Sequence, residues 1–186
     1  NTCIACNQAC LDHAFKNKLA SCLVNPIACH ETELVIKPTT QPKRIAVVGA
    51  GPAGLAFATT AAERGHAVTL FDAATEIGGQ FNLAKQIPGK EEFYETLRYY
   101  GKRLSITGVD VHLNSRQTVS SLMSGGFDEV VLATGVHPRD IDLPSTVEGC
   151  VVSYKDVLEQ RVEVGQRVAI IGAGGIGFDM GEFLSH

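Results

Sequence analysis

The chain has 186 residues, which is long for one small domain and short for two full ones, because typical domains hold about 100–200 residues. Sixteen Lys and Arg against 20 Asp and Glu give a net charge of −4, so the basic footprint of a nucleic-acid-binding protein is absent. No apolar run approaches the ~20 residues of a membrane span. Five of the six Cys lie in the first 29 positions, whereas all 19 Gly lie at or after Gly49, so we expect two different chemistries joined end to end.

Cysteines near the start of the chain follow the pattern C-x2-C-x3-C-x11-C, and they are Cys3, Cys6, Cys10 and Cys22. Three close thiols and one distant thiol are typical of a [4Fe–4S] site, because a short loop reaches only three corners of the cube. The alternatives are a zinc site, a disulfide framework, or buried structural cysteines. Zinc ligands normally come in two close pairs, so His13 or His30 would have to supply the missing ligand of the second pair. We expect Cys29 to be a small buried residue beside His30 and Glu31.

Two close prolines, Pro38 and Pro42, predict an extended linker over residues 37–43, which follows a cluster-binding segment at 1–36. Beyond the linker, the β-branched run 44–48 leads into a glycine-rich turn and a helical stretch, 55–64. A second predicted strand, 67–71, ends on Asp72. Strand, turn, helix, strand and acid in this order predict a dinucleotide site.

The fingerprint G-x-G-x-x-G supplies the candidate ligands of this site, namely Gly49, Gly51, Pro52, Ala53 and Gly54. Gly49 permits the tight turn, Gly51 lets the backbone approach a pyrophosphate, and Gly54 lets the helix pack closely on the strand. We expect Asp72 to accept hydrogen bonds from the ribose hydroxyls of an adenosine without a 2′-phosphate.

Further candidates follow the second strand. Gly79 belongs to a glycine pair where the chain passes close to a ligand or turns sharply. Lys90 is a candidate phosphate ligand, with a solvated loop lysine as the alternative. After a helix at 91–104 and a strand at 109–113, the strand 128–133 ends on Ala133, Thr134 and Gly135, at the edge where open α/β sheets bind ligands.

The run 167–171 and the glycines after it repeat the strand and the fingerprint, with Gly172, Gly174, Gly175 and Gly177 as candidate ligands. This duplication predicts an incomplete FAD-binding domain over 44–160 and the start of an NAD(P)H-binding domain over 161–186. We expect the chain to be a fragment, because it stops before the strand whose end would distinguish NAD from NADP.

These features, in this order, resemble the carboxyl-terminal half of the bacterial NADPH-dependent 2,4-dienoyl-CoA reductases. The resemblance includes Cys3-Ile-Ala-Cys6-Asn-Gln-Ala-Cys10, Ile77-Gly-Gly-Gln80 and Ile171-Gly-Ala-Gly-Gly-Ile-Gly177. Their superfamily, which includes trimethylamine dehydrogenase, joins an old-yellow-enzyme-like flavin barrel to a pair of glutathione-reductase-like nucleotide domains. The implied fold is α/β, a Rossmann-like parallel sheet that binds FAD and NAD(P), with a short iron–sulfur segment before it.

The resemblance also implies roles for individual residues. The four cysteines of the C-x2-C-x3-C-x11-C pattern would ligate a [4Fe–4S] cluster. Ala53 and Asp72 would touch FAD, and Gln80 and Lys90 would lie along the FAD. Gln117 would meet the adenine through its backbone. An FMN-binding barrel outside this chain would hold the dienoyl-CoA and the catalytic acid, so no catalytic residue is assigned here.

Electrons would pass from NADPH to FAD, the cluster and FMN, because a flavin accepts two electrons together and releases them singly to a one-electron carrier. One alternative is an amine dehydrogenase of the same architecture, with structural ADP in the first nucleotide site. Another is a non-catalytic module that binds zinc and a nucleotide. A dithiol reductase is disfavoured because Cys150 is solitary. The cluster and reduced thiols favour a cytoplasmic protein without membrane or nucleic-acid partners.

Overall fold

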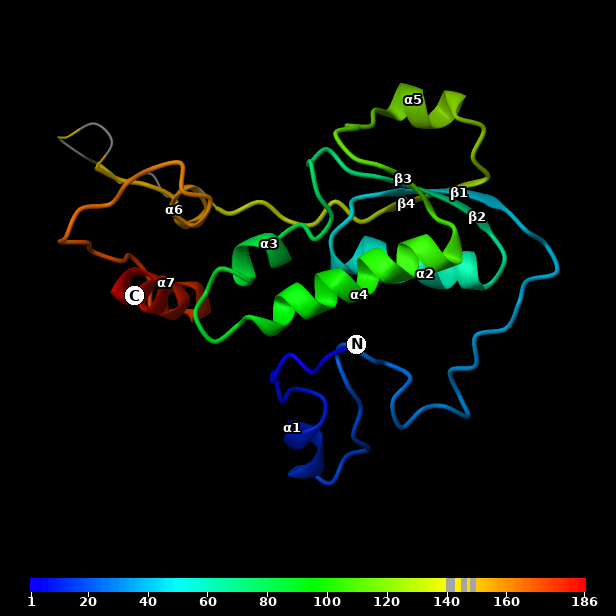
Figure 1. Ribbon diagram of the computed structural model, residues 1–186, viewed down its shortest axis with the longest axis horizontal. Helices are drawn as coiled ribbons and strands as arrows, with labels where there is room; N and C mark the ends of the chain where they lie inside the picture. Colours follow the sequence, from blue (N-terminus) through cyan, green and yellow to red (C-terminus); the bar gives the residue numbers. More distant parts are fainter. Residues whose placement is uncertain (140–142, 145–146, 148–149) are drawn as a thin grey trace. The chain divides into compact units, whose positions relative to one another are not determined.

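The computed structural model describes residues 1–139, 143–144, 147 and 150–186 (Figure 1). In the described chain, one parallel sheet has the strand order β3-β2-β1-β4. Its strands are β1 (Arg44–Val48), β2 (Ala67–Phe71), β3 (Asp110–His112) and β4 (Glu129–Leu132). The pairing aligns Val47 of β1 with Leu70 and Val131, so apolar side chains share one face. The parallel α/β Rossmann-like fold expected from the sequence is confirmed.

Two long helices, α2 (Pro52–Glu63) and α4 (Glu92–Thr107), cover that apolar face of the sheet (Figure 1). The core between them and the strands includes Val47, Leu55, Leu70 and Leu104. Because both helices follow strands of a parallel sheet, their N-termini lie at the carboxyl edge of the strands. The fold therefore gathers the ends of β1, β2 and β4 and the start of α2 in one region.

The remaining helices are short, apart from the last. They are α1 (Leu11–Ala14), α3 (Phe81–Ala84), α5 (Val119–Ser124), α6 (Tyr154–Leu158) and α7 (Gly175–Ser185). A reciprocal capping box between Thr118 and Ser121 begins α5. In the part of the chain that the structure describes, no helix is long and apolar enough to cross a bilayer.

The chain packs as two compact units. One comprises Asn1–Phe81 and Glu92–Gly135, and the other comprises Asn82–Glu91 and Val136–His186. The second unit has its own core of Ile87, Val157, Leu158 and Met180. The predicted segments at 1–36, 37–43, 44–160 and 161–186 concern cofactor sites rather than packing, and they stay predictions.

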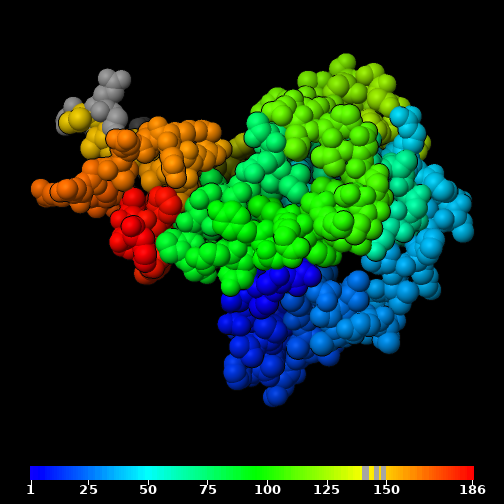
Figure 2. Space-filling view, in the orientation of Figure 1, coloured from blue at the N-terminus to red at the C-terminus, as the bar shows by residue number. Residues whose placement is uncertain are grey.

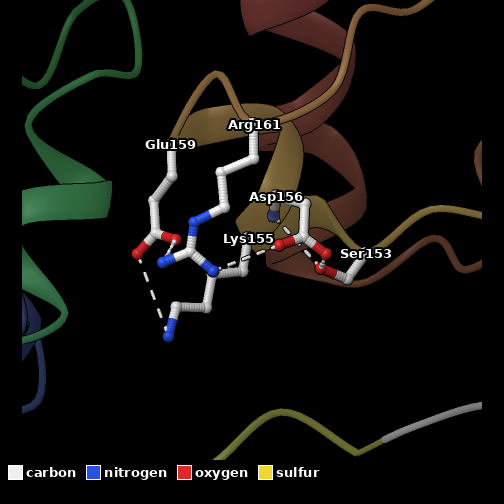
Figure 3. Close-up of polar contacts among 5 residues, drawn as sticks. All are labelled: Ser153, Lys155, Asp156, Glu159 and Arg161. Atoms are coloured by element: carbon white, nitrogen blue, oxygen red, sulfur yellow. Dashed lines mark hydrogen bonds and ion pairs between the residues drawn. The ribbon is translucent and has the colours of Figure 1, made fainter.

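Polar contacts close the turn that follows α6 in the second unit (Figure 3). Ser153 caps the helix by accepting the N–H of Asp156 at 3.1 Å. Arg161 then folds back to the Glu159 carboxylate at 2.7 Å and the Asp156 carboxylate at 3.4 Å. Such exposed pairs contribute little to stability, and here they link Arg161 to two acidic residues of the preceding turn.

Two local expectations are wrong. Residues 167–171 do not form a strand, because no neighbouring strand in the described chain pairs with them, and Val168 and Ile171 stay 48% and 65% exposed. Cys29 is exposed rather than buried. It lies in a turn with φ +64°, and its N–H donates to the Glu31 carboxylate at 3.0 Å, so the turn geometry rather than apolar packing sets its position.

Thr96 of α4 is buried, at 2% exposure, and its hydroxyl has no hydrogen-bond partner among the residues that the structure describes. We expect Thr96→Val to raise the free energy of unfolding by about 1 kcal/mol, because valine has the same shape without the desolvated hydroxyl. Thr59 is the matched control, since its buried hydroxyl donates to the Leu55 carbonyl at 2.8 Å. Chemical denaturation should show Thr59→Val to be neutral or destabilising; a loss of stability in Thr96→Val would contradict the prediction.

Candidate functional site

The first glycine-rich turn packs tightly against the end of β4. Gly49 has φ +110°, and a Cβ at this position would overlap the backbone carbonyl of Ala133. A Cβ at Gly54, in the first turn of α2, would overlap the carbonyl of Gly49. Turn, helix and strand end therefore approach more closely than any side chain would allow, as the fingerprint predicts.

Asp72 and Gly78 hold the centre of this turn. The N–H of Ala50, which is fully buried, donates to the Asp72 carboxylate at 2.5 Å, and the Ala50 carbonyl accepts the N–H of Gly78 at 2.8 Å. The second carboxylate oxygen of Asp72 accepts the N–H of Ala74 at 2.7 Å. The loop is thus held by its own neighbours, and each carboxylate oxygen keeps lone-pair capacity for a ribose hydroxyl.

Gly79 brings the segment after β2 against the fingerprint. It has φ +55°, and a Cβ there would lie 3.1 Å from the Cα of Gly51. Gly51 itself has open space where its Cβ would be. It is the N-cap of α2, whose first turn contains Pro52 and the exposed Ala53. A helix N-terminus beside bare backbone suits the diphosphate of a dinucleotide, because free N–H groups and the helix dipole both favour negative charge.

The other predicted residues of the first site have different environments. Ala133 lies against Gly49, and Thr134 and Gly135 follow it as exposed residues, Gly135 with φ +73°. Gln80 is exposed directly after Gly79. The side chain of Gln117 is engaged locally, since its amide donates to the Ser115 hydroxyl at 2.8 Å and its carbonyl accepts from Ser121 at 2.8 Å. Only its backbone is left for the predicted adenine contact, which stays a prediction.

Lys90 belongs to the second unit, where its ammonium pairs with the Asp179 carboxylate at 2.6 Å. The two side chains are only 37% and 33% exposed. Asp179 lies on α7, directly after the second fingerprint. Sequence reasoning missed this partner, and no local signal could have found it, because the two residues are far apart in the chain.

The second fingerprint has the same local geometry as the first. Gly172 has φ +116°, and a Cβ at Gly177 would overlap its carbonyl, as at the Gly49 and Gly54 pair. Gly174 begins α7 with φ −86° and ψ −174°, close to the −75° and −179° of Gly51. Gly175 begins the first turn of α7. Turn and helix therefore form even though the run before them is unpaired.

The cysteine segment turns back on itself (Figure 1), and its atoms form one continuous mass (Figure 2). Cys6 and Cys22 are half-buried, whereas Cys3 and Cys10 are exposed. The N–H of Ala5 donates to the Cys3 sulfur at 3.3 Å. The N–H of Ser21 donates to the Ala9 carbonyl at 2.6 Å, which places the residues next to Cys10 and Cys22 opposite each other.

All six cysteines are free thiols. Among the described residues, no three His, Cys, Asp or Glu side chains are already arranged around a metal position. The chemistry of the donor set nevertheless fits a [4Fe–4S] cluster, because it offers four thiols, an N–H directed at the Cys3 sulfur, and a backbone contact between Ser21 and Ala9, the residues that precede Cys22 and Cys10. The roles of the four cysteines stay predictions.

The family model described as pyridine nucleotide-disulphide oxidoreductase matches residues 43–186. A metal reductase from Desulforamulus reducens is 41% identical over 99% of this chain and 28% of its own length. A cinnamate reductase from Clostridium sporogenes is 35% identical over 99% of this chain and 27% of its own length.

A solved structure of 2-naphthoyl-CoA reductase, in complex with 2-naphthoyl-CoA, matches with a TM-score of 0.93 at 34% identity. The match covers 99% of this chain and 28% of that one. The chain thus spans little more than a quarter of the length of each of these proteins. The match includes the cysteine segment as well as the nucleotide folds, since it covers nearly the whole chain.

Proposed function

The chain belongs to the pyridine nucleotide-disulphide oxidoreductase family, and from the motifs that resemble those of the 2,4-dienoyl-CoA reductases we propose that it is the electron-input module of such an enzyme. The module would bind NADPH, FAD and a [4Fe–4S] cluster and would pass electrons to a flavin barrel elsewhere in the longer protein. The dienoyl-CoA would be reduced there, in the cytoplasmic degradation of unsaturated fatty acids.

One observation carries the proposal: Gly51, Asp72 and Gly79 come together at the carboxyl edge of the sheet, around bare backbone that suits a diphosphate. The repeat of that geometry at Gly172–Gly177 supports a second nucleotide site. Support for a reductase comes from the three similar proteins described above, which are named as reductases, one of them for a CoA thioester.

The residues of this chain would bind and orient the cofactors and would not themselves take part in the reaction. Asp72 would hold the ribose of FAD while keeping the Ala50 turn in place, and Gly51 and Gly79 would leave room for the diphosphate. Cys3, Cys6, Cys10 and Cys22 would hold the cluster. Bound FAD would accept the two electrons of one hydride together and release them singly to a cluster.

The test uses the full-length protein, purified without oxygen. Extracted cofactors and metal content are measured, and NADPH oxidation is followed with and without 2,4-hexadienoyl-CoA. The proposal requires FAD, iron and acid-labile sulfide in the protein and NADPH oxidation that depends on the dienoyl-CoA. If the protein contains iron and FAD but its NADPH oxidation does not depend on the dienoyl-CoA, the assignment of the electron-input module stands and the assignment of the substrate is wrong.

The same measurements separate the two alternatives. ADP in place of FAD, with oxidation of an amine, would identify an amine dehydrogenase. A colourless protein that contains zinc and a nucleotide but oxidises no NADPH would identify a binding module. The matched region argues against dithiol chemistry, because Cys150 is the only cysteine between residues 43 and 186.

A further inference from the structure

The cysteine segment is closed by three nested contacts. The Asn1 side chain donates to the Val24 carbonyl at 3.3 Å. Inside that pair, the N–H of Ser21 donates to the Ala9 carbonyl. Innermost, a ring nitrogen of His13, Nδ1, lies 2.9 Å from the Leu19 carbonyl. Because a carbonyl only accepts, Nδ1 carries the hydrogen in this contact, in either the neutral or the charged ring.

The 11 residues between Cys10 and Cys22 form an excursion of the chain, and His13 closes its tip in two ways. Its backbone carbonyl accepts the N–H of Lys18 at 2.9 Å, and its side chain bonds Leu19. A contact that fixes the middle of this excursion reduces the conformational freedom that the chain must lose when Cys22 is brought beside Cys10.

We propose that His13 is a positioning residue that presents Cys22 to the cluster by holding the tip of this excursion closed. The inference rests on the proposed function, in which the four cysteines hold a [4Fe–4S] cluster. His13 is not a ligand in this proposal, because the four cysteines already supply the four ligands that the cluster needs. Its effect is to raise the fraction of molecules in which the fourth thiol is in place.

The test compares cluster retention in full-length variants. His13→Leu and His13→Ala both remove the donor, whereas His13→Asn keeps an amide N–H close to the position of Nδ1. Lys16→Leu is the matched control on the same excursion, since the Lys16 side chain makes no hydrogen bond or ion pair within the described residues. Iron and sulfide per chain are measured, followed by the rate of iron loss to excess EDTA.

We expect His13→Leu and His13→Ala to lose iron about tenfold faster than the wild type, which corresponds to about 1.4 kcal/mol. His13→Asn should restore a rate within about threefold of the wild type, Lys16→Leu should match the wild type, and all four should keep equal FAD. Normal iron loss from the Leu and Ala variants would overturn the inference. Iron loss from the Asn variant as fast as that from the Leu and Ala variants would also overturn the inference, because the imidazole ring itself would then be required.

Failure of the proposed function gives a different result. A wild-type protein without iron and sulfide overturns the cluster, and with it the role of His13 toward Cys22. Amide hydrogen exchange of Ser21 in the metal-free protein then tests the closure separately. Faster exchange in His13→Ala than in Lys16→Leu supports the closure of the excursion, and equal exchange overturns it.

Discussion

Gly49→Ala is expected to prevent the first nucleotide fold from forming. The methyl group would overlap the backbone carbonyl of Ala133, and φ +110° is a conformation that alanine does not readily adopt. The atoms that the methyl group would overlap belong to the backbone, so no side chain can move away to relieve the clash. We expect a loss of about 4 kcal/mol or more in the free energy of unfolding, and a protein that contains little FAD. Thermal unfolding and the flavin content of the purified full-length protein measure both.

Gly51→Ala, two residues away, distinguishes an effect on folding from an effect on FAD binding. Gly51 has φ −75°, and a Cβ there would meet no atom of the described residues within 4 Å. This variant should therefore unfold like the wild type but bind FAD at least about tenfold more weakly, because the methyl group would enter the space of the diphosphate. Equal stability of Gly49→Ala and Gly51→Ala would show that the approach of Ala133 is not what requires glycine.

Asp72→Ala is expected to lower stability even without a nucleotide. It removes the acceptor of the Ala50 N–H and leaves that fully buried donor without a partner. Bonds to charged acceptors contribute about 1.5–3 kcal/mol each, so we expect the FAD-free protein to lose about 2–3 kcal/mol. Binding of FAD should fall further, because the ribose acceptor is lost as well. Denaturation of FAD-free protein and titration with FAD separate the two effects.

Asp110→Asn is the control for this prediction, because Asp110 is an exposed carboxylate on β3 whose ion-pair partner within the described chain is the nearby His112, at 2.8 Å. Its effect should stay within about 0.5 kcal/mol. If Asp72→Ala destabilises the FAD-free protein no more than Asp110→Asn does, then the bond to Ala50 does not hold the turn.

The first nucleotide unit could be predicted from the sequence because its signals are local. A β-branched run, a glycine fingerprint and a terminal acid place Gly49, Gly54 and Asp72 near one another through short connections. The predicted helix at 55–64 begins at Pro52 in the structure, because a proline is well suited to the first helical position and continues directly from the Gly51 N-cap.

Long-range partners could not be predicted in this way. The pairing of Lys90 with Asp179 depends on tertiary packing, so the sequence left a phosphate ligand and a solvated lysine equally open. The run 167–171 has the composition of a strand, yet a strand also needs a neighbour, and composition does not supply one. The second use of the Asp72 carboxylate, as an acceptor for Ala50, was missed because the motif assigns that side chain only to the ribose.

Residues 82–91 come from within the chain of the first unit but pack in the second. The chain therefore crosses between the units three times, not once, and a single cut cannot separate them cleanly. A first unit expressed alone up to Gly135 would carry Ile87, which is 3% exposed, without the Val157 and Met180 that cover it. Exchange of nucleotide units between relatives by recombination at a single junction would leave this apolar segment against a foreign surface. Recombinants should therefore survive best when residues 82–91 and 136–186 come from the same parent.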